Sequence, residues 1–73
     1  MNEKELINLR TDLIGELEAI NQYQEHIDMS NNDEAKHVWE HIRDDEKEHF
    51  AELIKIIRKL DKTQEEKFQK EEL

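Results

Sequence analysis

Residues 28–33 read Asp-Met-Ser-Asn-Asn-Asp, and this polar stretch decides the fold because it separates two long segments of helical periodicity. Short polar side chains of this kind hydrogen-bond to their own backbone and favour a turn. We expect the chain to reverse direction here, with Asn31 or Asn32 capping the helix that follows. The segments on either side then form the two arms of an antiparallel hairpin.

Both arms repeat their apolar residues in alternating steps of three and four, a spacing that places them along one stripe of a helix. In the first arm the repeat needs position 16 to complete it, and in the second it needs positions 46 and 49. We predict helices over about 3–28 and 33–60, joined by a turn over about 29–32. The apolar members are Leu6, Leu9, Leu13, Ile20, Tyr23 and Ile27, then Ala35, Trp39, Ile42, Leu53, Ile56 and Leu60.

The predicted fold class is all-α, with an antiparallel two-helix hairpin over residues 1–62 as its main domain. Residues 63–73 hold only two large apolar side chains, Phe68 and Leu73, and predict a short C-terminal helix or a flexible tail. Two helices leave their apolar stripe without a third wall, and 73 residues can bury little apolar surface by themselves. We therefore expect two copies to pair as a homodimer into a four-helix bundle.

Composition excludes several classes of protein. Twenty acidic against eleven basic residues give a net charge of -9, so we expect no nucleic acid partner. The absence of cysteine rules out disulfides, thiolate zinc sites and iron–sulfur clusters held by this chain. No stretch is apolar enough for a membrane helix or an export signal, so we expect no membrane partner and a cytoplasmic location.

Three side chains that ionise near neutral pH interrupt the apolar seam, and they are Glu16, Glu46 and His49. In a hairpin that turns near Asn31, Glu16 and Glu46 each lie fifteen residues from the turn and therefore fall at the same height. Glu46 and His49 are three residues apart, so they project from the same face of their helix and can close on one metal ion. Burying unpaired carboxylates is destabilising, and a cation between them is the simplest compensation.

A di-metal site of the ferritin-like kind needs a glutamate from each of two helices and a Glu-x-x-His from each of two others. One chain supplies half of this set, and a two-fold dimer supplies all of it. The dimer then offers four carboxylates and two imidazoles, and the four carboxylates would neutralise the four positive charges of two Fe(II) ions. Mixed carboxylate and imidazole ligands suit iron or manganese. We predict a ferroxidase that oxidises Fe(II) to Fe(III) with dioxygen or peroxide, with two iron ions per dimer. Tyr23, further along the seam, is a candidate hydrogen-bond donor to the ligands.

Other interpretations of the same residues stay open. Polar seam residues often only fix the register of a coiled coil, which would make the chain an acidic, non-catalytic dimerisation or adaptor module. The dimer could also hold zinc or manganese for structure alone. A second Glu-x-x-His, Glu34 and His37, and the pair formed by His37 and His41 fall on the outer face and predict solvated surface. We interpret His26 as an interface or capping residue.

Two stretches resemble a known family. Residues 15–23, Gly-Glu-Leu-Glu-Ala-Ile-Asn-Gln-Tyr, and residues 42–49, Ile-Arg-Asp-Asp-Glu-Lys-Glu-His, are similar to those of the encapsulated ferritins. The resemblance implies a ferritin-like di-iron ferroxidase whose centre forms between two helical hairpins and whose dimers join into a ring. It also implies that an encapsulin shell encloses the ring as its cargo, in a nanocompartment that serves iron storage and detoxification.

Residue by residue, the resemblance implies that Glu16, Glu46 and His49 are the iron ligands, that Tyr23 lies near them and that Glu18 belongs to an acidic path for incoming iron. The chain departs from the family pattern at two positions. Gly15 and Gln22 stand where better-known members carry an acidic residue and a tryptophan, so the resemblance does not specify the path of the iron. No cargo peptide is recognisable after Thr63, and the shell is implied by kinship alone.

Overall fold

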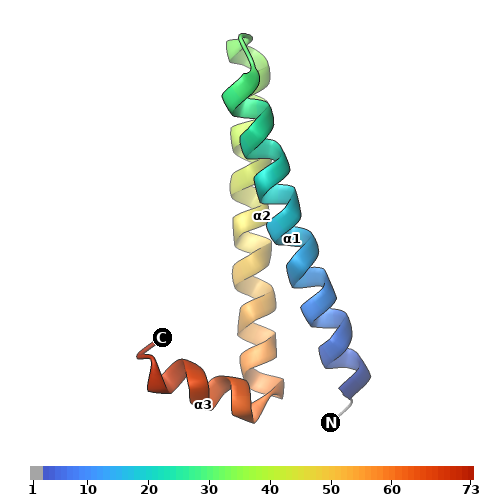
Figure 1. Cartoon of the computed structure of the whole chain (residues 1–73), viewed down its shortest axis with the longest axis vertical. Helices are drawn as coiled ribbons and strands as arrows, with labels where there is room; N and C mark the ends of the chain where they lie inside the picture. Colours follow the sequence, from blue (N-terminus) through green and yellow to red (C-terminus); the bar gives the residue numbers. More distant parts are fainter. Residues whose placement is uncertain (1–2) are drawn as a thin grey trace.

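The computed structural model describes residues 3–73 and consists of three helices (Figure 1). Helices α1 (Glu3–Met29) and α2 (Asp33–Leu60) run antiparallel along the long axis of a molecule measuring 47 × 27 × 14 Å. Helix α3 (Lys62–Lys70) leaves the end of α2 at a steep angle, at the end of the hairpin opposite the turn. The predicted all-α fold class is confirmed. The division into a domain 1–62 and a tail stays a prediction, and its first two residues lie outside the described ones.

The turn between α1 and α2 is fixed by side-chain oxygens. The Oδ1 atom of Asn32 accepts a hydrogen bond from the backbone N–H of Ala35 at 2.9 Å, which caps the first turn of α2. The hydroxyl oxygen of Ser30 accepts one from the backbone N–H of Asn32 at 3.0 Å. Of the two asparagines predicted as candidate caps, Asn32 is the one that caps the helix.

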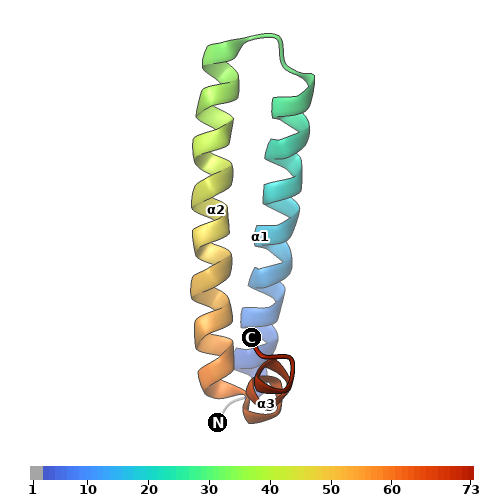
Figure 2. The same cartoon turned by 90° about the vertical axis from the view of Figure 1, so that its left-hand side faces the viewer.

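The hairpin has very little interior. Among residues 3–73 only Leu6 and Ile57 are buried, with 4% and 3% of their surface exposed. Other members of the seam, such as Leu13 and Leu53, are half-buried, because the fold has only two long helices to cover them. Figure 2 shows α1 and α2 as a single pair with no third long helix across them. No helix within residues 3–73 combines the length and the apolar character needed to cross a lipid bilayer.

Asp61 forms the corner between α2 and α3 and makes bonds in three directions. Its backbone N–H donates to the carbonyl oxygen of Ile57 at 2.8 Å, and its Oδ1 accepts from the N–H of Gln64 at 3.1 Å. Its Oδ2 accepts from the Arg10 guanidinium at 2.9 Å. The Gln64 amide and the Arg10 charge both favour the ionised carboxylate, so they lower the pKa of Asp61.

A second set of contacts holds α3 against α2. The Arg58 guanidinium donates to the Glu65 carboxylate and lies over the ring of Phe68, 4.6 Å from its centroid. The hydrogen bond from Arg58 lowers the pKa of Glu65. The C-terminal segment is therefore a docked helix.

We predict that Asn32→Ala lowers the free energy of unfolding by about 1 kcal/mol, because the N-terminal amides of α2 lose their acceptor. Asn31→Ala is the matched control, since it changes the same residue type one position away without touching the cap, and it should cost no more than a few tenths of a kcal/mol. Urea denaturation followed by circular dichroism measures both. Equal effects of the two substitutions would contradict the assignment of the cap.

Candidate metal centre

Glu16, Glu46 and His49 come together where the middle of α1 passes the middle of α2, and we call these three residues the carboxylate–histidine group. Glu16 reaches across from α1, while Glu46 and His49 project from one face of α2 because they are three residues apart. Each residue offers one ligand atom, and these atoms all lie within 4.8 Å of one another. The sequence therefore predicted correctly that these side chains would meet, while their role as ligands stays a prediction.

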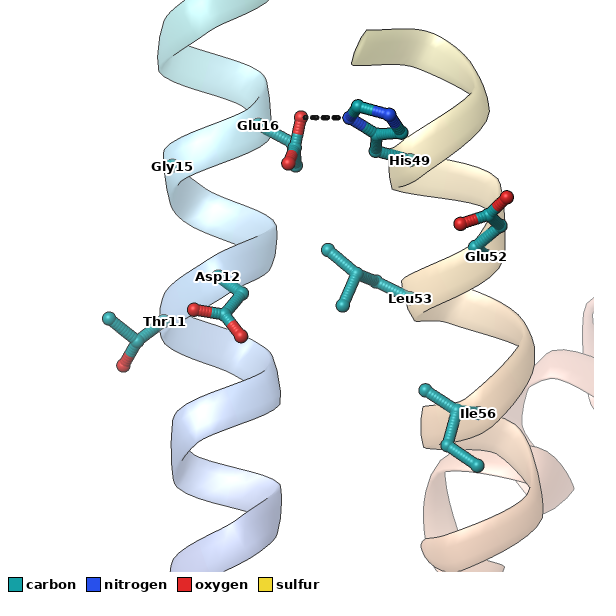
Figure 3. A pocket seen from close by; sticks show the side chains of 8 residues that line it. All are labelled: Thr11, Asp12, Gly15, Glu16, His49, Glu52, Leu53 and Ile56. Atoms are coloured by element: carbon teal, nitrogen blue, oxygen red, sulfur yellow. Dashed lines mark ion pairs between the residues drawn. The ribbon is translucent and has the colours of Figure 1, made fainter. Parts of the chain in front are cut away.

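The imidazole of His49 joins the two carboxylates. Its Nδ1 atom lies 3.5 Å from Oε2 of Glu16 and 3.5 Å from Oε2 of Glu46. Figure 3 shows the Glu16 carboxylate and the His49 ring pointing toward each other across the gap between the helices. Three groups with oxygen and nitrogen donors thus share one small volume.

The carboxylates of this group are more enclosed than the histidine. The side chains of Glu16 and Glu46 are 22% and 20% exposed, against 49% for His49. The Oε2 atom of Glu16 is buried and has no hydrogen-bond partner. Nδ1 of His49 lies within ion-pair distance of this oxygen but makes no hydrogen bond to it, and a cation is one group that would satisfy it. The donor set and this orphaned oxygen both fit a bound iron or manganese ion.

The closeness of the two carboxylates shifts pKa values within the carboxylate–histidine group. The pKa of Glu16 is raised because its protonated form can hydrogen-bond to Glu46, because the site is partly desolvated and because the Glu46 charge repels a second negative charge. Desolvation works against the charged form of His49, but the attraction of both carboxylates outweighs it and raises the pKa of the imidazole.

A groove of about 580 Å³ opens beside the group, between α1 and α2. Figure 3 shows its walls, with Leu53 and Ile56 on α2 and Asp12 on α1 below Glu16. An added Cβ at Gly15 would meet nothing within 4 Å, so this wall of the groove is open. Eight residues line it, namely Thr11, Asp12, Gly15, Glu16, His49, Glu52, Leu53 and Ile56.

Asp12 and Glu52 were not singled out from the sequence, although both line this groove beside the carboxylate–histidine group. Their spacing carried a signal, since Asp12 lies four residues before Glu16 and Glu52 three residues after His49. Both are therefore on the helix faces next to the seam, where an acidic side chain is normally solvated.

The other predicted site residues, Tyr23 and Glu18, lie outside the carboxylate–histidine group. The ring of Tyr23 packs edge-on against His26, with centroids 6.0 Å apart, and His26 lies 5.1 Å from the ring of Trp39. This aromatic row occupies the half of the hairpin near the turn. Glu18 is exposed on α1 and is not part of the carboxylate–histidine group. The roles predicted for Tyr23 and Glu18 stay predictions.

The histidines of the outer face gather no comparable set of ligands. Nε2 of His41 lies 3.6 Å from an oxygen of Asp45, and both side chains are largely exposed. Across residues 3–73, the carboxylate–histidine group is the one place where three or more potential ligands bring their atoms together. The alternative pairs Glu34 with His37 and His37 with His41 take part in no such group.

The sequence model of a family described as EncFtn-like matches residues 1–72. Two curated proteins of Myxococcus xanthus are also similar to the chain. The encapsulin nanocompartment cargo protein EncC is 40% identical over 65 residues, which are 88% of this chain and 50% of EncC. The encapsulin nanocompartment cargo protein EncB is 35% identical over 66 residues, which are 90% of this chain and 42% of EncB. No solved structure matches the chain.

The family match covers almost the whole chain, so the protein belongs to the EncFtn-like family. The resemblance to encapsulated ferritins inferred from residues 15–23 and 42–49 is confirmed. The chain spans about half the length of the curated relatives that it matches.

We predict that the metal-free protein becomes more stable as the pH falls from about 8 to about 5. Glu16 and His49 have raised pKa values, so each adds stability at low pH that is lost as the pH rises through its folded pKa. Asp61 and Glu65 have lowered values and act in the opposite direction, below about pH 4.5. Thermal unfolding followed by circular dichroism at a series of pH values measures the trend.

Glu16→Gln should flatten this pH dependence, because one of the two titrating groups is removed. Glu18→Gln is the matched control, since it makes the same change on the exposed side of the same helix and should leave the dependence as it is. Stability that falls steadily from pH 8 to pH 5 would show that the raised pKa values do not govern this range.

Proposed function

We propose that the chain is a ferroxidase whose di-iron centre forms when two copies place their carboxylate–histidine groups against each other. The observation that carries the proposal is the convergence of Glu16, Glu46 and His49 within 4.8 Å, with a buried carboxylate oxygen that no donor satisfies. Membership in the EncFtn-like family supports it.

The small hydrophobic core of the hairpin supports the proposed dimer. With two buried residues among those described, a single hairpin leaves most of its seam half-open, and a second copy laid against the groove would cover Leu53 and Ile56. The same contact would bring a second Glu16, Glu46 and His49 to the site. Four carboxylates then balance the four positive charges of two Fe(II) ions.

Iron is the substrate of the proposed reaction. Two Fe(II) ions give up one electron each, and dioxygen takes the pair with two protons to form hydrogen peroxide, or peroxide takes it with two protons to form two waters. The glutamates would hold the ions and compensate the charge that oxidation adds. His49 would supply a neutral nitrogen ligand, which requires that it release the proton favoured in the metal-free protein.

The names of the relatives support a location for this activity. EncC and EncB are encapsulin nanocompartment cargo proteins, and we propose that this chain is likewise enclosed by an encapsulin shell, where oxidised iron would be stored. Dimers would join further into a ring. This chain spans about half of each relative. Its binding to a shell and the activity of the whole protein are therefore both proposals.

Anaerobic titration with Fe(II) should saturate at one iron per chain and should convert monomers into dimers, as measured by mass photometry or sedimentation. Exposure to air should then consume oxygen faster than the same iron does in buffer. Glu46→Ala or His49→Ala should lower the initial rate at least tenfold, because loss of a ligand costs no less than the roughly 10–100-fold loss typical of residues that only support ligands.

Glu48→Ala and His41→Ala are the matched controls, since each removes the same residue type from the outer face of α2. Both should keep the rate and the stoichiometry of the unaltered protein. Oxygen uptake at the rate of free iron would refute the ferroxidase proposal. Tight binding and dimerisation with no uptake would instead favour a structural metal site, and a stable dimer indifferent to iron would favour an adaptor module.

A further inference from the structure

Arg43 lies on α2 three residues before Glu46, so the two side chains project from the same face of the helix. Both are largely enclosed, with 18% of the Arg43 side chain and 20% of the Glu46 side chain exposed. Side chains on a helix lean toward its N-terminus, which tilts the Glu46 carboxylate back toward Arg43. The two residues are therefore placed to form an ion pair.

The structure of residues 3–73 holds the Arg43 guanidinium in other bonds and shows no ion pair between it and Glu46. The Nη1 atom donates to Oε1 of Gln24, across on α1, at 2.9 Å. The Nε atom donates to Oδ1 of the neighbouring Asp44 at 3.1 Å. Gln24 is fixed in turn, because its Nε2 donates to Oδ1 of Asp28 at 2.9 Å.

The bond to Gln24 extends the guanidinium away from the carboxylate–histidine group. Gln24 lies eight residues beyond Glu16 on α1, which places it about 12 Å nearer the turn at 1.5 Å of rise per residue. Glu16 and Glu46 lie at one level of the hairpin, since each is fifteen residues from the turn. The positive end of Arg43 is therefore drawn along the hairpin toward the turn and away from Glu46.

A guanidinium paired with Glu46 would compete with a metal ion. It would occupy the carboxylate oxygens, and its charge would repel an incoming divalent cation. The histidine of the group can release its proton to become a metal ligand, whereas an arginine stays charged at every pH near neutrality. Arg43 can therefore be kept from Glu46 only by bonds that hold it elsewhere.

We infer that Gln24 is a positioning residue, which holds the Arg43 guanidinium toward the turn and so keeps the Glu46 carboxylate free for a metal ion. The inference rests on the proposed function for one point, that Glu46 is a metal ligand. Gln24 itself touches no metal and acts through Arg43. Loss of Gln24 should therefore weaken metal binding, whereas loss of Arg43 should not.

The first test is anaerobic titration of the full chain with Fe(II). Gln24→Met keeps the length of the side chain but removes the acceptor, so the released Arg43 can pair with Glu46. This substitution should raise the dissociation constant for Fe(II) about fivefold, the upper end of the range for one ion pair that water can reach. Adding Arg43→Gln should restore the affinity of the unaltered protein, and Arg43→Gln alone should bind iron at least as tightly as that protein.

Two control variants separate this effect from simpler ones. Lys47→Gln removes the same charge as Arg43→Gln from an exposed neighbour of Glu46, and it should not rescue Gln24→Met. Gln69→Met repeats the change of Gln24→Met at an exposed position on α3 and should leave the affinity as it is.

A bond that merely braced the two helices would give a different pattern. Arg43→Gln breaks the same bond as Gln24→Met, so it would then weaken iron binding equally, and the double variant would show no rescue. That pattern would overturn the inference. An unchanged affinity in Gln24→Met, or rescue by Lys47→Gln, would overturn it as well.

The second test needs no metal. Urea denaturation in the presence of a chelator gives the effect of Glu46→Gln on the ratio of folded to unfolded protein. In the Gln24→Met background this effect should be less favourable by about fivefold than in the unaltered protein, because Glu46 has gained Arg43 as a partner. The difference should vanish when Arg43→Gln is added.

The two proposals fail differently. Iron binding without oxygen uptake would refute the ferroxidase proposal and leave the role of Gln24 intact. If the unaltered chain bound no iron, the proposed function would fall, and the metal-free cycle would decide whether Gln24 restrains Arg43. If the unaltered chain oxidised iron while Gln24→Met changed neither affinity nor the metal-free cycle, only the inference about Gln24 would fall.

Discussion

Two carboxylates facing each other across a thin helical hairpin are the constraint on which the rest of this structure depends. Glu16 and Glu46 are both carboxylates, both are largely enclosed, and Nδ1 of the half-exposed His49 lies 3.5 Å from an oxygen of each. Glu46 raises the pKa of Glu16, and both carboxylates raise the pKa of His49. A divalent cation would relieve the repulsion between the two carboxylates.

The second constraint is the shortage of interior. A hairpin with two buried side chains among its described residues obtains little stability from its own core, so its remaining apolar surface is available for association. That surface lies on two sides of α1, one beside the groove next to the carboxylate–histidine group and one on the outer face at Ile7 and Ile14. The small size of the hairpin and the exposure of its apolar side chains thus both favour association.

The C-terminal end is richer in basic side chains than the rest of the chain. Arg58 is bonded to Glu65 and stacked on Phe68, and Asp61 joins α3 to both long helices. Residues 55–70, which include this end, carry six basic and three acidic side chains, while acidic ones dominate the remainder of the chain. Charge is therefore distributed unevenly along the hairpin, with six of the eleven basic side chains at the end opposite the turn.

The sequence by itself determined the helices, the turn and the meeting of Glu16 with Glu46 and His49, because periodicity and equal distance from a turn fix which side chains share a face and a height. It did not decide between Asn31 and Asn32 as the cap, or between a helix and a flexible tail after Thr63. Tertiary structure decided these points. The cap depends on one side-chain geometry, and α3 is docked by a bond between Arg10 and Asp61, which lie 51 residues apart, beyond the reach of any local pattern.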